Sequence, residues 1–129
     1  MSLARGVLAV SSLAYLALGA WLLARPQGLA SVGVDASTPA ARTELRATYG
    51  GLELGLGLFL AWCLLGDAER LRAGLWAAAL TIGGFGAGRL VGLLVDRPPE
   101  RVFLALLAVE VLGVVAAAVA LARLPEATA

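Results

Sequence analysis

Four charged residues lie inside long apolar segments, and these are the residues of the chain that could perform chemistry. They are Arg46, Glu53, Arg89 and Glu110. A charged side chain within a lipid-embedded helix costs roughly 2.5–3.5 kcal/mol, so each one requires either a compensating partner or a function. Arginine binds carboxylates and phosphates in a forked geometry, and glutamate accepts hydrogen bonds or transfers protons. The pattern therefore indicates an intramembrane polar site or a set of ion pairs that staple helices together.

Three of these charged groups and Tyr15 fall at a similar depth in four separate segments. With a helical rise of about 1.5 Å per residue, Glu53 and Glu110 each lie about 12 Å into their segments. Arg89 and Tyr15 lie about 9 Å and about 13 Å before the ends of theirs. If the segments alternate in direction, these positions share one level. We therefore predict that they meet in one polar pocket.

A stripe of polar and small residues shares the helix face of Glu53. Tyr49 is four residues before Glu53, so its phenol could donate a hydrogen bond to that carboxylate. Arg46 is one turn closer to water and could extend inward, so that two cations and two anions leave the pocket neutral. The stripe consists of Arg42, Arg46, Tyr49, Gly50, Glu53 and Gly57.

The composition that surrounds these residues is typical of a protein whose surface faces lipid. Of the 129 residues, 60% are hydrophobic and only 15% are charged, and the mean hydropathy is +0.90. Soluble domains are closer to half apolar and a quarter charged. These values exclude a free-standing soluble enzyme and a disordered tail. The net charge of +1 gives no electrostatic footprint for DNA or RNA, so we expect no nucleic-acid partner.

The residue inventory also excludes much metal and cofactor chemistry. The sequence has no histidine, which excludes imidazole bases, haem axial histidines and His-ligated zinc. Cys63 is the single cysteine and cannot form an intrachain disulfide, so we expect it to pack in an apolar segment. We predict no cofactor and no metal.

Four apolar stretches of roughly 20 residues are each long enough to cross a bilayer as a helix. None alternates as a barrel strand would, so we predict an all-α, four-helix transmembrane bundle that forms one domain over residues 1–129. The first stretch exceeds the apolar core of about 7–15 residues in a signal sequence, so we expect it to be retained. The predicted spans cover about residues 6–24, 45–65, 75–95 and 102–121.

Prolines and capping residues mark the ends of these helices. Pro26 ends the first helix, because the residue before a proline is pushed out of the helical region. Thr38 followed by Pro39 is typical of a helix start, so the second helix should begin before its apolar core. The Pro-Pro-Glu sequence at 98–100 should open the fourth helix, with Glu100 in the first turn.

The connections predict how the helices are arranged. Short loops after the second and third helices favour antiparallel neighbours, with both termini on one side of the membrane. The arginines divide about equally between the two sides, so the orientation stays open. Within the longer loop at 25–38, residues 29–34 are apolar enough to lie on the membrane interface. Trp21, Trp62 and Trp76 lie near span ends, where we expect them to anchor the protein in the lipid bilayer.

Glycines four residues apart form two small-residue faces. Gly51 and Gly55 form one on the second helix, and Gly84, Gly88 and Gly92 form the other on the third. Such faces let helix backbones approach closely in lipid. We expect them to pack the bundle, and they could also join copies of the chain into a homo-oligomer.

Two motifs and one glutamate carry a family resemblance. They are RATYGG at 46–51 with GLG at 55–57, GRLVG at 88–92 before Asp96, and Glu110. From residue 46 to residue 113 the chain resembles the bacterial membrane family known as domain of unknown function 4345. The resemblance implies four transmembrane helices in a chain of this size and a bacterial cytoplasmic membrane protein. It implies no catalytic or binding residue, because the family has no assigned activity.

The leading hypothesis is that the polar pocket binds a small amphipathic or lipid-like molecule. Arg46 and Arg89 would contact an anionic or carbonyl group, Tyr49 would donate a hydrogen bond, and the two glutamates would balance the charge. The residues proposed to bind this ligand are Tyr15, Arg46, Tyr49, Glu53, Arg89 and Glu110.

Three other functions stay open, and with them the question of enzymatic activity. The first is a membrane-embedded isomerase or cyclase in which Glu53 or Glu110 serves as general acid or base. The second is a proton-coupled exporter of small molecules that works as an oligomer. Neighbouring arginines oppose both, because they favour ionised carboxylates. The third is an accessory subunit in which the charges only staple the helices.

Overall fold

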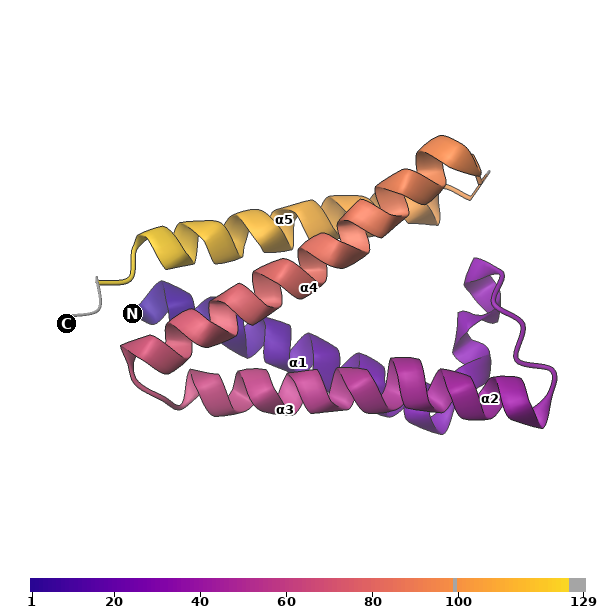
Figure 1. The fold of residues 1–129 in the computed structure, drawn as a ribbon, viewed down its shortest axis with the longest axis horizontal. Coiled ribbons are helices and arrows are strands. Elements are labelled where there is room, and N and C mark those ends of the chain that lie inside the picture. Colours follow the sequence, from indigo (N-terminus) through magenta and orange to yellow (C-terminus); the bar gives the residue numbers. More distant parts are fainter. Residues whose placement is uncertain (99, 126–129) are drawn as a thin grey trace. The chain divides into compact units, whose positions relative to one another are not determined.

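The computed structural model describes residues 1–98 and 100–125, and the fold in these residues is helical throughout (Figure 1). No β-strand occurs in this part of the chain, which confirms the all-α prediction. Besides the α-helices there is a 3-10 helix, η1, and a π-helical turn, η2. The elements are α1 (Ser2–Ala24), η1 (Pro26–Val32), α2 (Pro39–Leu45), η2 (Arg46–Gly51), α3 (Leu52–Leu64), α4 (Ala68–Val95) and α5 (Val102–Ala122).

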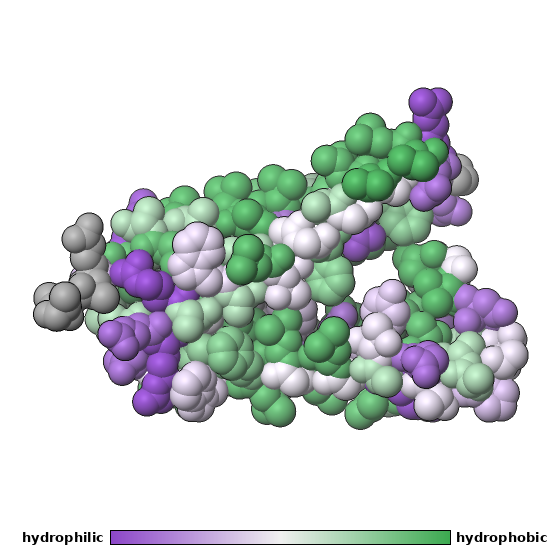
Figure 2. All heavy atoms as spheres, in the orientation of Figure 1, coloured by the Kyte–Doolittle hydropathy of each residue, from purple (hydrophilic) through white to green (hydrophobic). Residues whose placement is uncertain are grey.

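Four helical stretches are long and apolar enough to cross a membrane, as the sequence predicts. The second is the continuous run of α2, η2 and α3. In Figure 2, hydrophobic side chains cover the middle of the helices and hydrophilic ones gather toward their ends. This distribution is the one that a bilayer requires of a helical span. The stretches are Ser2–Ala24, Pro39–Leu64, Ala68–Val95 and Val102–Ala122.

Local chemistry sets the first helix boundaries as predicted. The helix α1 ends at Ala24, and Pro26 opens η1 after Arg25, whose backbone is not helical. The Thr38 side chain accepts a hydrogen bond from the Ala41 backbone nitrogen at 3.1 Å, which caps α2 at its start. This cap satisfies an amide that has no partner within the helix.

The predicted opening of the fourth helix at residues 98–100 is wrong. The helix α5 begins at Val102, so Glu100 lies in the preceding turn. There its carbonyl accepts from the Phe103 nitrogen at 3.3 Å. The reason is visible in the sequence, because Pro98 itself precedes a proline and is kept out of the helical region. Pro99, which belongs to the same prediction, lies outside the described residues.

The chain forms two compact units, which are described separately. Unit 1 comprises Met1–Leu8 and Cys63–Ala129, and unit 2 comprises Ala9–Trp62. The single domain predicted over residues 1–129 stays a prediction, as do the antiparallel bundle and the shared side of the termini.

Unit 1 consists mainly of α4 and α5, which pack along each other. A Cβ atom built on Gly83 would lie 3.6 Å from Val114, and one built on Gly86 would lie 3.4 Å from Glu110. Residue numbers therefore rise on one helix as they fall on the other. At the α3–α4 turn, Arg5 donates to the carbonyls of Leu64 and Gly66 at 3.0 and 3.1 Å. The buried Cys63 lies in this unit, as the prediction of a packing cysteine requires.

Unit 2 is held together by a close approach of α1 to η2 and α3. Ser12 donates its hydroxyl hydrogen to the Gly57 carbonyl at 2.9 Å. A Cβ atom built on Gly19 would lie 2.7 Å from the Leu54 nitrogen, and one built on Gly50 would lie 2.9 Å from the Leu23 Cα. These glycines are therefore required where two backbones nearly touch.

Within each of the two units, the predicted glycine faces are not the ones at which helices pack. Gly55, Gly84 and Gly88 have no atom within 4 Å of an added Cβ. Gly51 and Gly92 have only groups of their own helical segment or its end at 3.7 and 3.8 Å. On α4, Gly86 lies on the face toward α5, and Gly84 and Gly88 lie on the opposite face. The use of these open faces in a homo-oligomer stays a prediction.

Candidate functional site

The Arg89 and Glu110 side chains form a forked ion pair between α4 and α5. Arg89 Nε donates to both carboxylate oxygens of Glu110, at 3.1 and 3.0 Å, and Arg89 Nη2 donates to Oε1 at 2.8 Å. The exposed fractions of the two side chains are 23% and 12%. The guanidinium carbon lies 6.0 Å from the centre of the Phe103 ring, within the range of a cation–π contact. The predicted pairing of Arg89 with a carboxylate is thus confirmed.

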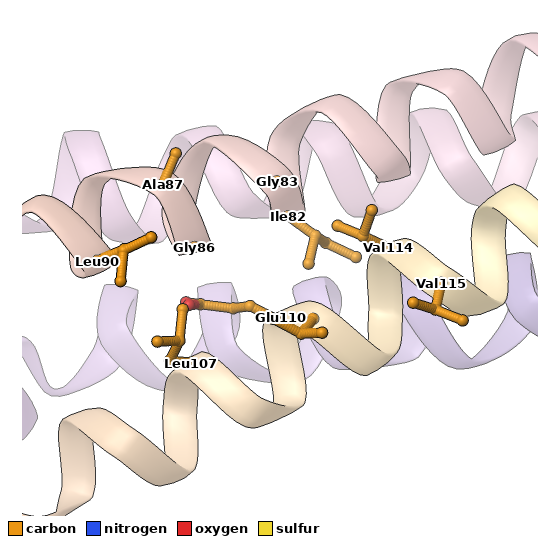
Figure 3. A pocket seen from close by; sticks show the side chains of 10 residues that line it. Ile82, Gly83, Gly86, Ala87, Leu90, Leu107, Glu110, Val114 and Val115 are labelled. Carbon is orange, nitrogen blue, oxygen red and sulfur yellow. The ribbon is translucent and has the colours of Figure 1, made fainter.

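An apolar hollow of about 260 Å³ lies beside this ion pair in unit 1. Figure 3 shows Glu110 extending from α5 toward α4, with its carboxylate next to Leu107 and Gly86. A Cβ atom on Gly86 would lie 3.6 Å from Glu110 Oε2, so the glycine makes room for the carboxylate. The hollow is lined by Ile82, Gly83, Gly86, Ala87, Leu90, Leu107, Glu110, Val111, Val114 and Val115.

The Glu110 carboxylate that lines the hollow is fully bonded, whereas Arg89, its partner, keeps unused hydrogen-bond donors. Both oxygens of Glu110 already accept from Arg89. A guanidinium has five N–H donors, and Arg89 uses only those of Nε and Nη2. In the described part of the chain nothing accepts from its Nη1. An additional molecule in the hollow would therefore meet an apolar wall and the Glu110 carboxylate, with the unused donors of Arg89 on the far side of the ion pair.

Sequence reasoning missed this hollow, although a signal for it was present. Gly83 and Gly86 lie six and three residues before Arg89, on the same face of the helix. Small residues on that face leave space beside the arginine. The more regular spacing of the glycines on the other face of α4 concealed this pattern.

Unit 2 contains the other four predicted site residues, in contrasting environments. Glu53 is buried, with an exposed fraction of 6%, and Tyr15 is also buried. Tyr49 is exposed at 36%. Arg46 is half-buried and donates its Nε hydrogen to the Leu23 carbonyl at 3.0 Å. Of the charged residues in this unit, Glu53 is therefore the one held in the interior.

The Glu53 carboxylate lacks the partners that the sequence predicts for it. Its Oε2 atom is buried and has no hydrogen-bond partner among the described residues. Within residues 1–98 and 100–125, neither Tyr49 nor Arg46 bonds to it. The predicted hydrogen bond from Tyr49 to Glu53 is therefore wrong.

The predicted stripe holds for Gly50, Glu53 and Gly57, which are buried, and the π turn η2 explains why Tyr49 departs from it. The Leu52 nitrogen donates to the Ala47 carbonyl, five residues back instead of four. The wider turn shifts the register between Tyr49 and Glu53, so Tyr49 is exposed although it lies four residues before the buried Glu53. The adjacent Gly50 and Gly51 were the available signal, because paired glycines are common where a helix departs from regular geometry.

The six predicted site residues thus divide between the two units. Unit 1 joins Arg89 to Glu110, and unit 2 contains Tyr15, Arg46, Tyr49 and Glu53. A single pocket shared by all six stays a prediction. In the part of the chain that the structure describes, no three His, Cys, Asp or Glu side chains are grouped to hold a metal ion.

Comparison with known proteins agrees with the motifs. The family model described as domain of unknown function (DUF4345) matches residues 3–121. The chain belongs to the DUF4345 family. The match extends well beyond residues 46–113, so the DUF4345 resemblance predicted from the two motifs is confirmed over nearly the whole chain. No curated protein and no solved structure matches the DUF4345 chain.

Proposed function

We propose that this DUF4345 chain is an integral membrane protein that binds a small amphipathic, lipid-like molecule between α4 and α5. The observation that carries the proposal is the apolar hollow beside the Arg89–Glu110 ion pair. Ligand sites of this kind combine mainly apolar walls with a few polar groups that fix orientation. The ligand's apolar part would occupy the hollow, and its polar end would face the ion pair.

The charge state of the site favours one chemistry for the polar end. Glu110 neutralises Arg89, so the pair does not require a full counter-charge from the ligand. The donors left on Arg89 fit an acceptor such as a carbonyl, ester or phosphate oxygen. The volume of about 260 Å³ is below the usual range for drug-sized ligands, so it fits part of an acyl or prenyl chain.

We place this protein in the bacterial cytoplasmic membrane, with the lipid bilayer as its immediate partner. Four helices apolar enough to cross a membrane support a location in a membrane. All basic residues are arginines, which is typical of a GC-rich bacterial genome. This composition supports the bacterial cytoplasmic membrane in particular.

The proposal is tested by filling the hollow. Gly83→Leu places a side chain into it, because Gly83 lines the hollow and an added Cβ meets Val114 at an ordinary 3.6 Å. Gly84→Leu is the matched control, because an added Cβ there meets nothing within 4 Å. Purified wild type and both variants are compared by mass spectrometry of the extracted lipids. We expect a co-purifying amphipath in wild type and Gly84→Leu and its loss in Gly83→Leu.

Equal retention of that molecule by Gly83→Leu and Gly84→Leu would exclude the hollow as its site. Thermal unfolding in detergent identifies a Gly83→Leu protein that has lost its fold. For that case Ala87→Leu, on an exposed residue of the same hollow, is the second filling variant.

A structural role is the second candidate, and the forked ion pair itself favours it. Because Glu110 has both oxygens bound to Arg89, the pair could serve only to fix the register of α4 against α5. The same geometry weakens the enzyme and exporter hypotheses for Glu110, which has no unbonded oxygen to exchange a proton. A pure staple predicts no co-purifying molecule in any variant.

A further inference from the structure

We propose that Glu53 and the π turn η2 form a second binding site, in unit 2, which takes a lipophilic organic cation. This site is separate in residues and opposite in polarity from the donor site at Arg89. It therefore goes beyond the function proposed above, and either proposal can fail without the other.

The first argument is that a buried carboxylate oxygen of Glu53 lacks a hydrogen-bond donor. Glu53 has an exposed fraction of 6%, and its Oε2 atom has no hydrogen-bond partner among the described residues. Buried polar groups are normally paired, and an exception requires an explanation. For a carboxylate within an apolar span, the missing partner must be a hydrogen-bond donor or a positive charge.

The second argument is that the nearby arginines are directed elsewhere. Arg46 donates its Nε hydrogen to the Leu23 carbonyl at 3.0 Å. Arg42 donates to the carbonyls of Ala36 and Ser37 at 3.3 and 2.9 Å. In the described chain, no ion pair joins either guanidinium to Glu53. The helix that carries Glu53 therefore holds two cations but does not use them to neutralise it.

The third argument is the π turn immediately before Glu53. The Leu52 nitrogen, next to Glu53, donates to the Ala47 carbonyl five residues back. Single π turns within α-helices are frequent at functional sites. Thr48 and Tyr49 in the same turn are exposed, so the turn is open to a ligand from the outside of the helix.

Together these features specify the occupant. An unpartnered carboxylate oxygen disfavours an anion, or a carbonyl oxygen of a ligand, at this point. The apolar span around Glu53 favours a cation that carries its own apolar surface over a hydrated metal ion. A lipophilic organic cation satisfies both requirements.

The test uses two probes of the same shape and opposite charge, tetraphenylphosphonium and tetraphenylborate. Binding to the full chain in detergent micelles is measured by titration calorimetry, with empty micelles subtracted. We expect saturable binding of the phosphonium and none of the borate. This comparison needs only the wild-type protein, so it does not depend on the folding of any variant.

The residue is then tested with Glu53→Gln, which keeps the shape and removes the charge. We expect phosphonium affinity to fall about tenfold or more, which corresponds to at least about 1.4 kcal/mol. Glu53→Asp should retain part of the affinity. Glu44→Gln is the matched control, because Glu44 is an exposed glutamate of α2, in the same helical stretch. It should bind as wild type does.

Three results would overturn the proposal. They are no saturable phosphonium binding by wild type, equal binding of phosphonium and borate, or unchanged affinity in Glu53→Gln. Variants that fill the hollow at Gly83 should leave phosphonium binding intact, so failure of the α4–α5 site is distinguishable from failure of this one.

Discussion

At the scale of single residues, the two membrane glutamates have opposite environments. Glu110 accepts three hydrogen bonds from Arg89, whereas Glu53 has a buried oxygen that accepts none in the described chain. The same residue type at the same predicted depth therefore has two different roles. Glu110 belongs to a completed ion pair, and Glu53 is available to a partner.

The ion pair leads to a prediction about stability. Removing one member of a largely buried pair leaves the other charge uncompensated, so Glu110→Ala should lower the free energy of unfolding by about 3 kcal/mol. Replacing both partners with apolar residues, as in Arg89→Met with Glu110→Leu, should restore most of that loss. Unfolding in detergent, followed by circular dichroism, measures both effects. If Glu110→Ala is no less stable than the exposed control Glu69→Ala, the pair does not staple the helices.

At the scale of the elements, close contact between backbones decides which glycines the packing of the helices requires. Adding a methyl group at an open helical position normally stabilises a helix, because alanine has the higher propensity. The same change at a crowded position forces the helices apart. The two effects on stability have opposite signs, so an experiment can distinguish the crowded glycines of unit 2 from the open ones.

Gly19→Ala and Gly55→Ala should therefore change stability in opposite directions. At Gly19 the new Cβ would lie 2.7 Å from the Leu54 nitrogen, and we expect a loss of about 1–3 kcal/mol. At Gly55 it would meet nothing within 4 Å, and we expect a gain of about 0.5–1 kcal/mol. Thermal unfolding of the two variants in one detergent provides the comparison. Equal shifts in both variants would contradict the close approach of α1 to α3.

The elements also show how far the sequence predicts this structure. Length, hydropathy and the Thr38 cap predict the spans, because these signals are local. The glycine faces could not be assigned, because spacing alone does not say which side of α4 meets α5. The π turn at 46–51 was missed for a related reason, since its geometry accompanies the contact of Gly50 with Leu23. Glu53 could be recognised as an unusual residue, but its missing partner could not.

At the scale of the whole molecule, the number of spans constrains where the termini lie. A chain that crosses a bilayer four times returns to its starting side, so both termini should face the same compartment. Positively charged segments normally select the cytoplasmic side. Here Arg5, Arg70, Arg72 and Arg123 would lie on the side of the termini, and Arg25, Arg42, Arg97 and Arg101 on the other.

With Arg46 at the border of the second side, the count is four against four or five, and we therefore expect the protein to insert in both orientations. The test starts from Cys63→Ser, which removes the single cysteine, and adds Ser2→Cys, Pro125→Cys or Ser37→Cys one at a time, at exposed uncharged positions that leave every arginine in place. Labelling of intact cells with a membrane-impermeant maleimide should modify each of the three only in part. The labelled fractions for positions 2 and 125 should agree, and the fraction for position 37 should be complementary to theirs. Complete labelling of position 37 with none at positions 2 and 125 would show a single orientation. Different fractions at positions 2 and 125 would instead contradict the four-span topology, because an even number of crossings cannot separate the termini.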